Sequence, residues 1–383
     1  MRGRYGWWIG LPVVVLIAAM TGYVFWPLPK PAESVAVNSA LGDGDSAGYQ
    51  RAYEPRPFQF PVDHGPHPEF RNEWWYVTGN LADATGRQFG YQLTLFRIAL
   101  APTPPIADSA WRTNQVYMGH FALTDVATGQ HHAFERFSRD SVGLAGAQAT
   151  PFRVWLDDWA LTGAESDTFP IRVSAQEGKV AINLTLSTAK PVVLQGNRGL
   201  SQKSAEPGNA SYYYSYTRLP TEGTVRLGET TFTVNGASWL DREWSTSALG
   251  PEQSGWDWFA LQLDDGRDLM FYRLRRKDGS VDPHSKGVLV AADGQTRPLG
   301  WNEVILQPLG EWASPKTGDR YPARWRLLLP AENMDLTITP KVADQEMRLT
   351  VRYWEGTITV NGRADAQLIS GQGYLEMTRY EQE

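Results

Sequence analysis

The stretch Arg71-Asn72-Glu73-Trp74-Trp75-Tyr76-Val77-Thr78-Gly79-Asn80-Leu81 places two charged residues beside three consecutive aromatic residues. Its pattern predicts the first strand of a β-barrel. A charged side chain next to tryptophans is costly to bury unless it pairs with another charge or faces a ligand cavity. The stretch is therefore either a brace inside a barrel or the wall of a binding site.

Alternation along this strand assigns its side chains to two faces. Arg71, Glu73 and Trp75 share one face, whereas Trp74 and Tyr76 share the other. Because Arg71 lies on the face of Glu73, it is a ready partner for that carboxylate. We favour the brace, and keep Glu73 as a catalytic candidate and Trp74, Trp75 and Tyr76 as ligand-binding candidates.

The chain from residue 58 onward alternates in the same way between polar and apolar residues. Turn signals of the Asp-Gly and Asn-Gly type separate the runs, and no amphipathic helical run longer than a turn or two is visible. Evenly spaced short strands predict an all-β barrel or sandwich. The clearest strands are residues 89–98, 180–186, 230–234, 256–263 and 348–354.

Composition excludes several classes of function. The chain has 383 residues, a net charge of −6 and no cysteine, so disulfides and cysteine nucleophiles are absent. No basic cluster stands out beyond residues 273–277, and we expect no nucleic-acid partner. There is no Gly-rich phosphate loop and no Gly-x-Ser-x-Gly elbow, and the loop with His64 and His67 offers too few metal ligands. We therefore expect no cofactor and no metal.

The N-terminal segment has the features of a membrane anchor. Residues 7–26 carry no charge and follow two arginines. They are long enough to cross a bilayer, and the positive-inside rule places the bulk of the chain in the periplasm. We expect residues 1–29 to be a single-pass inner-membrane anchor and residues 30–57 to be a flexible linker. The alternative is a signal peptide cleaved near residues 37–40, which would give a secreted or periplasmic protein.

A repeated motif indicates two related units. Thr231-Phe-Thr-Val-Asn-Gly236 and Thr357-Ile-Thr-Val-Asn-Gly362 are near copies, and acidic residues beside aromatics follow each of them. The match is short, and it is also ordinary hairpin sequence. Residues 219–223 have the composition of a connection. We expect one β-barrel domain at residues 58–220 and a second at residues 221–383.

Two carboxylates are the leading candidates for chemistry. In Trp239-Leu-Asp-Arg-Glu-Trp244, a strand places Asp241 and Glu243 on one face and Arg242 on the other. Two carboxylates on one face can act as an acid/base pair if burial shifts their pKa values. The alternative, which we favour, is that each pairs with an arginine, for example Arg71 or Arg97, as a brace.

Other side chains are candidates by their position in strands. His120, in the run Met118–Asp125, faces inward and is either a hydrogen-bonded core residue or a proton shuttle. Tyr212, Tyr214 and Tyr216 form one face, suited to a long hydrophobic ligand or to interdomain packing. We expect the ligand wall to be completed by Trp239, Arg242 and Trp244.

Five motifs occur in order between residues 58 and 382. They are His67-Pro-Glu-Phe-Arg-Asn-Glu-Trp-Trp-Tyr-Val-Thr-Gly-Asn-Leu81, Gly119-His-Phe-Ala-Leu-Thr-Asp125, Tyr213-Tyr-Ser-Tyr-Thr-Arg-Leu219, Ser238-Trp-Leu-Asp-Arg-Glu-Trp244 and Gly373-Tyr-Leu-Glu-Met-Thr378. Together they resemble the AttH-type lipocalin-like family, which includes hydroxyneurosporene synthase, a carotenoid 1,2-hydratase, and members labelled predicted secreted hydrolases. The resemblance implies two consecutive lipocalin-like (calycin) β-barrel domains with a cavity at or between them.

The chain departs from the hydratase branch of that family at two positions. Where that branch carries a His before the Trp, and an acidic residue after a Tyr equivalent to Tyr272, this sequence has Arg242 and Leu274. The resemblance makes Tyr272 a ligand-binding candidate. An arginine cannot deliver a proton to an alkene, which argues against hydration by that residue set.

Three functions remain open, in this order. The first is a membrane-anchored, periplasm-facing protein that binds a hydrophobic small molecule or lipid, beside an ABC-type export system as the AttH name implies for its relatives. The second is a cofactor-free hydro-lyase acting on an isoprenoid, with His120, Glu73, Asp241 or Glu243 as the acid. The third is a secreted hydrolase. An apolar cavity without a reactive pair favours binding, whereas a carboxylate or His120 at the cavity favours an enzyme.

Overall fold

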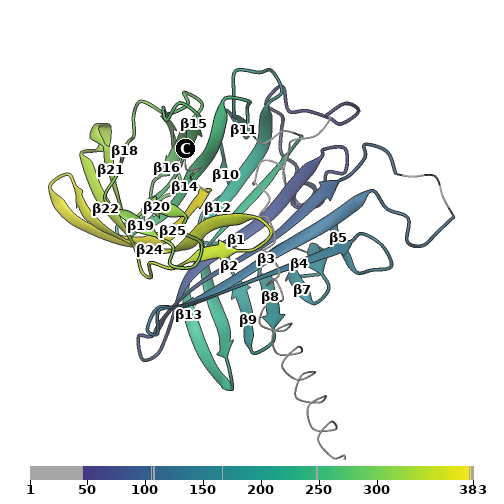
Figure 1. Cartoon of the computed structure of the whole chain (residues 1–383), viewed down its shortest axis with the longest axis horizontal. Helices are drawn as coiled ribbons and strands as arrows, with labels where there is room; N and C mark the ends of the chain where they lie inside the picture. The colour runs from purple at the N-terminus through teal and green to yellow at the C-terminus, as the bar shows by residue number, and fades with distance from the viewer. Residues whose placement is uncertain are drawn as a thin grey trace, which may run out of the picture. The chain divides into compact units, whose positions relative to one another are not determined.

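The computed structural model describes residues 46–104, 106, 108–165, 167–246, 249–378 and 380. Within them the regular structure is almost wholly β, and helical structure is limited to short 3-10 turns at Val62–His64 and Pro330–Glu332. These strands form a 13-stranded sheet, a 10-stranded sheet and a two-stranded sheet (Figure 1). The predicted all-β class is confirmed.

The first sheet contains the stretch that predicted the fold. Its order is β4-β3-β2-β1-β13-β12-β9-β8-β7-β6-β5, with β10 and β11 paired to β12. β1 lies between β2 and β13 and is antiparallel to both. The strands are β1 (Asn72–Asp83), β2 (Gln88–Ala99), β3 (Gln115–Asp125), β4 (Gln130–Arg139), β5 (Ala145–Gln148), β6 (Arg153–Leu156), β7 (Trp159–Thr162), β8 (Ile171–Glu177), β9 (Val180–Leu186), β10 (Val193–Leu194), β11 (Leu200–Gln202), β12 (Ala210–Leu227) and β13 (Thr230–Ser245).

The second sheet has the order β17-β16-β15-β14-β25-β24-β22-β21-β18, with β23 paired to β24, while β19 and β20 form the small sheet. Its strands, and those of the small sheet, are β14 (Gln253–Leu263), β15 (Asp268–Arg276), β16 (Lys286–Val290), β17 (Thr296–Gly300), β18 (Ile305–Pro308), β19 (Glu311–Ala313), β20 (Arg320–Pro322), β21 (Trp325–Leu329), β22 (Met334–Pro340), β23 (Glu346–Arg348), β24 (Arg352–Ala364) and β25 (Gln367–Thr378).

The chain changes sheet later than the domain boundary predicted at residue 220. β12 runs through Pro220 and pairs with β13 on one side and β9 on the other, so residues 219–223 are strand and not a connection. The change falls between Ser245 and Gln253. The prediction differed because a Pro-Thr-Glu-Gly segment is typical of turns, whereas here the long hairpin of β12 and β13 determines the pairing.

The folded part also begins earlier than Phe58. The sequence predicts a flexible linker up to residue 57, but Ala52 is buried and the Tyr49 hydroxyl donates to the Ala99 carbonyl at 2.9 Å. Polar and backbone contacts hold this segment in place. The linker was predicted from its low apolar content, which gives no information on such contacts.

Residues 30–45 of the predicted linker and the predicted anchor at residues 7–26 lie outside the described residues. In the part of the chain that the structure describes, no helix has the length and apolar character needed to cross a bilayer. The anchor therefore stays a prediction.

The two large sheets pack against each other, with β1 next to β25, β2 next to β24 and β12 next to β14 (Figure 1). Alternation along β1 sends Trp75 into the core of the first sheet, whereas Trp74 and Tyr76 face the second sheet. This is the predicted division of faces. A separate core fills the second sheet, and a further apolar cluster that includes Trp239 and Trp258 lies between the sheets.

Candidate active site

A cavity of about 120 Å³ lies between the two sheets. Strands β1, β2, β3, β12 and β13 supply one side, and strands β14, β15, β24 and β25 supply the other. Apolar walls around a few polar groups are typical of small-molecule sites. The apolar wall consists of Trp74, Phe96, Met118, Leu249, Trp256, Trp258, Leu274 and Val351.

Four carboxyl groups line this cavity. Asp241 and Glu243 come from β13, Glu355 from β24 and Glu376 from β25. As predicted, Asp241 and Glu243 share a face, and Arg242 points to the other. Glu355 and Glu376 are cross-strand partners in the pairing of β24 with β25. Carboxyl groups from the two sheets therefore share one apolar space.

Asp241 is buried and accepts hydrogen bonds from three side chains. Ser215 Oγ donates to its Oδ1 at 2.5 Å, Trp239 Nε1 donates to the same oxygen at 2.7 Å, and the Tyr213 hydroxyl donates to Oδ2. Burial raises the pKa of Asp241 to about 7, although these hydrogen bonds act to lower it. This carboxyl group can therefore exchange a proton near neutral pH.

Glu355 and Glu376 form a carboxyl pair with little hydrogen bonding. Within the described residues, neither oxygen of the buried Glu355 accepts a hydrogen bond. Burial and the charge of Glu376 raise the pKa of Glu355 well above its usual value, and the hydroxyls of Tyr76 and Tyr353 act to lower it. Glu376 accepts one hydrogen bond from Trp256 Nε1 at 2.8 Å, and burial raises its pKa to about 7. Each carboxyl group of this pair therefore opposes the ionisation of the other.

Glu243 has a different environment from the other three carboxyl groups, because a cation neutralises it. Lys203 Nζ lies 2.9 Å from Glu243 Oε1 and 4.5 Å from the centre of the Tyr272 ring. The Tyr272 hydroxyl shares a hydrogen bond of 2.8 Å with Ser201 Oγ. This side of the cavity therefore holds a compensated ion pair, not a proton donor.

His120 on β3 is buried in the cavity wall and faces inward, as predicted. Its Nδ1 is 2.7 Å from the Tyr353 hydroxyl, and its Nε2 is 3.1 Å from Oε1 of Glu135 on β4. The imidazole thus bridges a tyrosine of the second sheet and a carboxylate of the first sheet.

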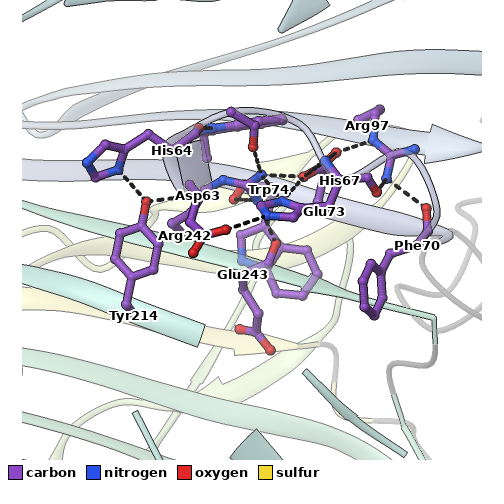
Figure 2. A network of polar contacts seen from close by, with 12 residues as sticks. Asp63, His64, His67, Phe70, Glu73, Trp74, Arg97, Tyr214, Arg242 and Glu243 are labelled. Atoms are coloured by element: carbon purple, nitrogen blue, oxygen red, sulfur yellow. Dashed lines mark hydrogen bonds and ion pairs between the residues drawn. The ribbon is translucent and has the colours of Figure 1, made fainter. Parts of the chain in front are cut away.

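Glu73 does not line the cavity. Figure 2 shows it in its network with Arg97 and Arg242. It is fully buried and forms ion pairs with Arg97 and Arg242, and the His67 main-chain N–H donates to its Oε1 at 3.1 Å. Burial acts to raise the pKa of Glu73, but the two guanidinium groups outweigh it and hold that pKa well below its usual value. Glu73 is therefore a brace, whose partners are Arg97 and Arg242 and not the expected Arg71.

Arg242 also belongs to this brace and not to a ligand wall. Its guanidinium donates to the Gly65 carbonyl at 2.5 Å and lies 3.9 Å from the centre of the Trp75 ring. Trp75 and Trp244 are buried in the core of the first sheet. All three were ligand-binding candidates, but they occupy the face of the sheet opposite to Asp241.

The tyrosines of β12 face the other way from the prediction. Tyr212, Tyr214 and Tyr216 pack in the core of the first sheet, whereas Tyr213 lines the cavity and donates to Asp241. Three consecutive tyrosines supply both faces of a strand, so alternation alone cannot tell which face meets the ligand.

Six of the sequence candidates do line the cavity: Trp74, Tyr76, His120, Asp241, Glu243 and Tyr272. Trp239 lies beside it and binds Asp241. The arginine partners expected for Asp241 and Glu243 do not occur among the described contacts, since neutral donors bind Asp241 and a lysine pairs with Glu243.

Sequence reasoning did not identify Lys203, Tyr213, Tyr353 or Glu355 as site residues. Glu376 was visible as an acidic residue beside an aromatic one in Gly373–Glu376, and Tyr353-Trp354-Glu355 has the same character. Neither sequence pattern indicates which carboxylate of a later strand faces Asp241, because that position depends on how the two sheets pack.

Comparison with known proteins agrees with this architecture. The family model described as AttH-like matches residues 51–380. A crystal structure assigned to AttH from Nitrosomonas europaea is 35% identical, with a TM-score of 0.77 over 87% of this chain and 100% of that one. Kievitone hydratase from Nectria haematococca is 15% identical, with a TM-score of 0.65 over 87% and 96% of the two chains. CghA with Sch210972 is 12% identical, with a TM-score of 0.53 over 91% and 98%.

The fold is that of a lipocalin-like β protein, and its two large sheets fit two lipocalin-like domains. The chain belongs to the AttH-like family. The predicted family resemblance is confirmed. A search of curated proteins gave no match.

Proposed function

We propose that the protein is a cofactor-free hydro-lyase that adds water to a carbon–carbon double bond of an apolar, isoprenoid-type small molecule. One observation carries this proposal: Asp241, Glu355 and Glu376, whose pKa values are all raised, line one cavity with aromatic walls. A carboxylic acid that stays protonated near neutral pH can donate its proton, and a nearby carboxylate can accept one from water.

The environments of the carboxyl groups assign their roles. Glu355 is the general acid, because burial favours its protonated form. Asp241 is the general base, because three donors stabilise its carboxylate. Glu376, the cross-strand partner of Glu355, opposes the ionisation of that acid by its charge. Glu355 donates its proton to one carbon of the double bond, which forms a C–H bond and leaves a carbocation at the other carbon. Water then forms the C–O bond, and Asp241 accepts the proton that this water loses.

The aromatic walls suit such a cation. Trp74, Trp256 and Trp258 line the cavity, and an aromatic face attracts a cation by about 0.5 to 2 kcal/mol. A trisubstituted double bond gives a tertiary cation when it is protonated. An acyclic isoprenoid or a related polyene therefore fits this site better than a sugar or a phosphate ester.

Two further observations support the proposal. One chain with this fold carries the name of a hydratase. In addition, Arg242, which stands where the hydratase branch of the family has a His, lies outside the cavity. The substitution at that position therefore leaves the carboxyl groups of the site in place.

The test is a product assay in oxygen-18 water. The full-length protein, purified in detergent, is incubated with farnesol, squalene and lycopene, and the products are analysed by mass spectrometry. We expect a tertiary alcohol that contains one oxygen-18 atom. Exposed Glu311, paired with Arg320 at the surface, gives a control variant, Glu311→Gln, that should match the wild type. Tight binding of these compounds with no alcohol formed would overturn the proposal.

Binding without turnover is the second candidate function, and the apolar wall of the cavity favours it. Native mass spectrometry and lipid extraction of the same preparation distinguish the two functions. A carrier keeps an unaltered isoprenoid or lipid through purification, whereas an enzyme releases the hydrated product.

We also propose, from the sequence, that residues 7–26 anchor the protein in the inner membrane with the folded part in the periplasm.

A further inference from the structure

A second hollow, which we call the groove, lies at the other end of the strands that form the cavity. It has a volume of about 340 Å³ and shares no lining residue with the cavity. On β14, Trp256 and Trp258 line the cavity, whereas Gln262 and Leu263 line the groove. The other lining residues, supplied by both sheets, are polar apart from one glycine: Gln88, Arg218, Asp264, Lys341, Thr359, Ser370, Gly371 and Gln372. A lining of this kind suits a polar ligand.

Lys341, the residue after β22, is a half-buried cation without a counter-ion among the described residues. Its Nζ donates to Oδ1 of Asn80 on β1 at 3.0 Å. An ammonium group has three N–H donors, and no other acceptor in the described part of the chain takes one of them. Burial lowers the pKa of Lys341 to about 8, and no carboxylate of the described residues acts to raise it. Two donors of this side chain are therefore available to a ligand.

The charge of Arg218 on β12 is only partly compensated. Its Nε and Nη2 donate to Oδ1 of the buried Asp268 at 3.0 and 2.6 Å, but Lys190 Nζ donates to Oδ2 of the same carboxylate at 2.8 Å. The neighbouring Asp265 is itself paired with Arg267 at 2.7 Å. This cluster therefore keeps one positive charge in excess. Among the described residues, no group accepts a hydrogen bond from Nη1 of Arg218.

Asp264 is the one acidic side chain among the described residues that line the groove. Its Oδ2 accepts hydrogen bonds from the Ser370 main-chain N–H at 3.1 Å and from the Ser370 hydroxyl at 2.5 Å. The residue is exposed, so water and salt screen its charge. In agreement with this, Asp264 does not act on the pKa of Lys341. Asp264 therefore leaves the positive charge of the groove in place.

We propose that the groove binds a small oxyanion, a carboxylate or phosphate group held between Lys341 and Arg218. Charged N–H donors form short, strong hydrogen bonds with such oxygens, and a guanidinium group matches their geometry. Both cations already tie the sheets together, Lys341 through Asn80 of β1 and Arg218 through the Leu263 carbonyl of β14 at 2.9 Å. These ties need none of the unused donors, from which an anion can accept. The site is separate from the proposed reaction, so the failure of one does not decide the other.

Isothermal titration calorimetry of the full-length protein in detergent, at about pH 7, tests the site with inorganic phosphate and with succinate. We expect saturable binding of at least one of these probes, and the probe that binds more tightly identifies the preferred oxyanion. Lys341→Met removes the ammonium group but keeps an unbranched apolar chain, and it should raise Kd about tenfold or more. The matched control is Lys179→Met, which removes an exposed lysine paired with Glu229 and should keep the wild-type Kd.

Melting temperatures separate binding in the groove from the general effect of salts. Phosphate stabilises many proteins because it is excluded from their surface, and this effect should be equal in the wild type and in Lys341→Met. Binding adds a further rise in the wild type, in Lys179→Met and in the charge-conserving Lys341→Arg, but not in Lys341→Met. Sodium chloride at the same ionic strength is the reference. The proposal is overturned if neither probe binds the wild type saturably, or if Lys341→Met binds with the wild-type Kd.

Discussion

Asp241 of β13 and Glu376 of β25 occupy equivalent positions in the two sheets. Asp241 pairs across strands with Tyr76 of β1, and Glu376 pairs with Trp258 of β14. The strand orders β3-β2-β1-β13-β12 and β16-β15-β14-β25-β24 correspond. The cavity is therefore formed by two related half-sites, each with a carboxyl group at the same place.

The half-sites differ at one position that matters for the chemistry. Ser215 is the cross-strand partner of Asp241, and Glu355 is the cross-strand partner of Glu376. A hydroxyl donor stabilises the carboxylate in the first half-site, whereas a second carboxyl group opposes ionisation in the other. This difference separates a proposed base from a proposed acid.

We expect the stability of the fold to decrease as the pH rises from about 4 to about 7. Burial raises the pKa of Asp241 from 3.8 and of Glu376 from 4.5, each to about 7, so the folded protein holds these protons more tightly than the unfolded chain. This contribution is complete below the unfolded pKa values and is lost as the pH rises through the folded ones.

The double variant Asp241→Asn with Glu376→Gln removes both titrations. Calorimetry measures the melting temperatures of the double variant and of the wild type. The melting temperature of the variant minus that of the wild type should increase from about pH 5 to about pH 8. A difference that does not change with pH would show that these groups do not titrate as described.

The brace predicts a large stability loss on Glu73→Gln. The change leaves the buried guanidinium groups of Arg97 and Arg242 without their anion, which costs about 3–5 kcal/mol in other proteins. Glu229→Gln is the control, because its pair with Lys179 is exposed and should contribute less than about 1 kcal/mol. Urea unfolding measures both, and equal losses would contradict the role of the brace.

The faces of β12 predict opposite results for two neighbouring tyrosines. Tyr213→Phe removes a donor to Asp241, so the pKa of that carboxyl group should rise and the pH profile of hydration should move to higher pH. Tyr212→Phe removes only a hydrogen bond to the Glu54 carbonyl, 2.9 Å away, and should leave the profile in place. Equal shifts in both variants would mean that β12 is assigned to the wrong face.

The anchor predicts an intact N-terminal segment in the mature protein. Mass spectrometry of protein extracted from membranes should detect peptides that include residues 7–26. A mature protein that begins near Leu41 would instead indicate a cleaved signal peptide.

Alternation in the sequence was enough to predict the faces of β1 and β13. Trp74 and Trp75 lie on opposite faces of β1, as expected, and Asp241 and Arg242 lie on opposite faces of β13. Alternation fails where both faces carry the same residue type, as in the tyrosine run of β12, and it contains no information on which strands of two sheets stack. That packing brings Glu355 to the side of the cavity that faces Asp241.

The internal repeat shows the same limit. Thr231–Gly236 lies in β13 and Thr357–Gly362 lies in β24, but the strand order makes β13 equivalent to β25. The structurally equivalent segments are Trp239–Asp241 and Tyr374–Glu376, which share only a pattern of aromatic, leucine and acid. The two sheets correspond in strand order, but the most obvious sequence match does not align them.

The central claim is that the carboxyl groups of the cavity transfer protons. The most direct test is the single-turnover rate of hydration by Glu355→Gln, measured together with its Kd for the same isoprenoid. Glutamine has nearly the size of glutamate but no acidic proton, so the account predicts a rate at least about 100-fold lower at an unchanged Kd. Hydration at the wild-type rate by Glu355→Gln would contradict it.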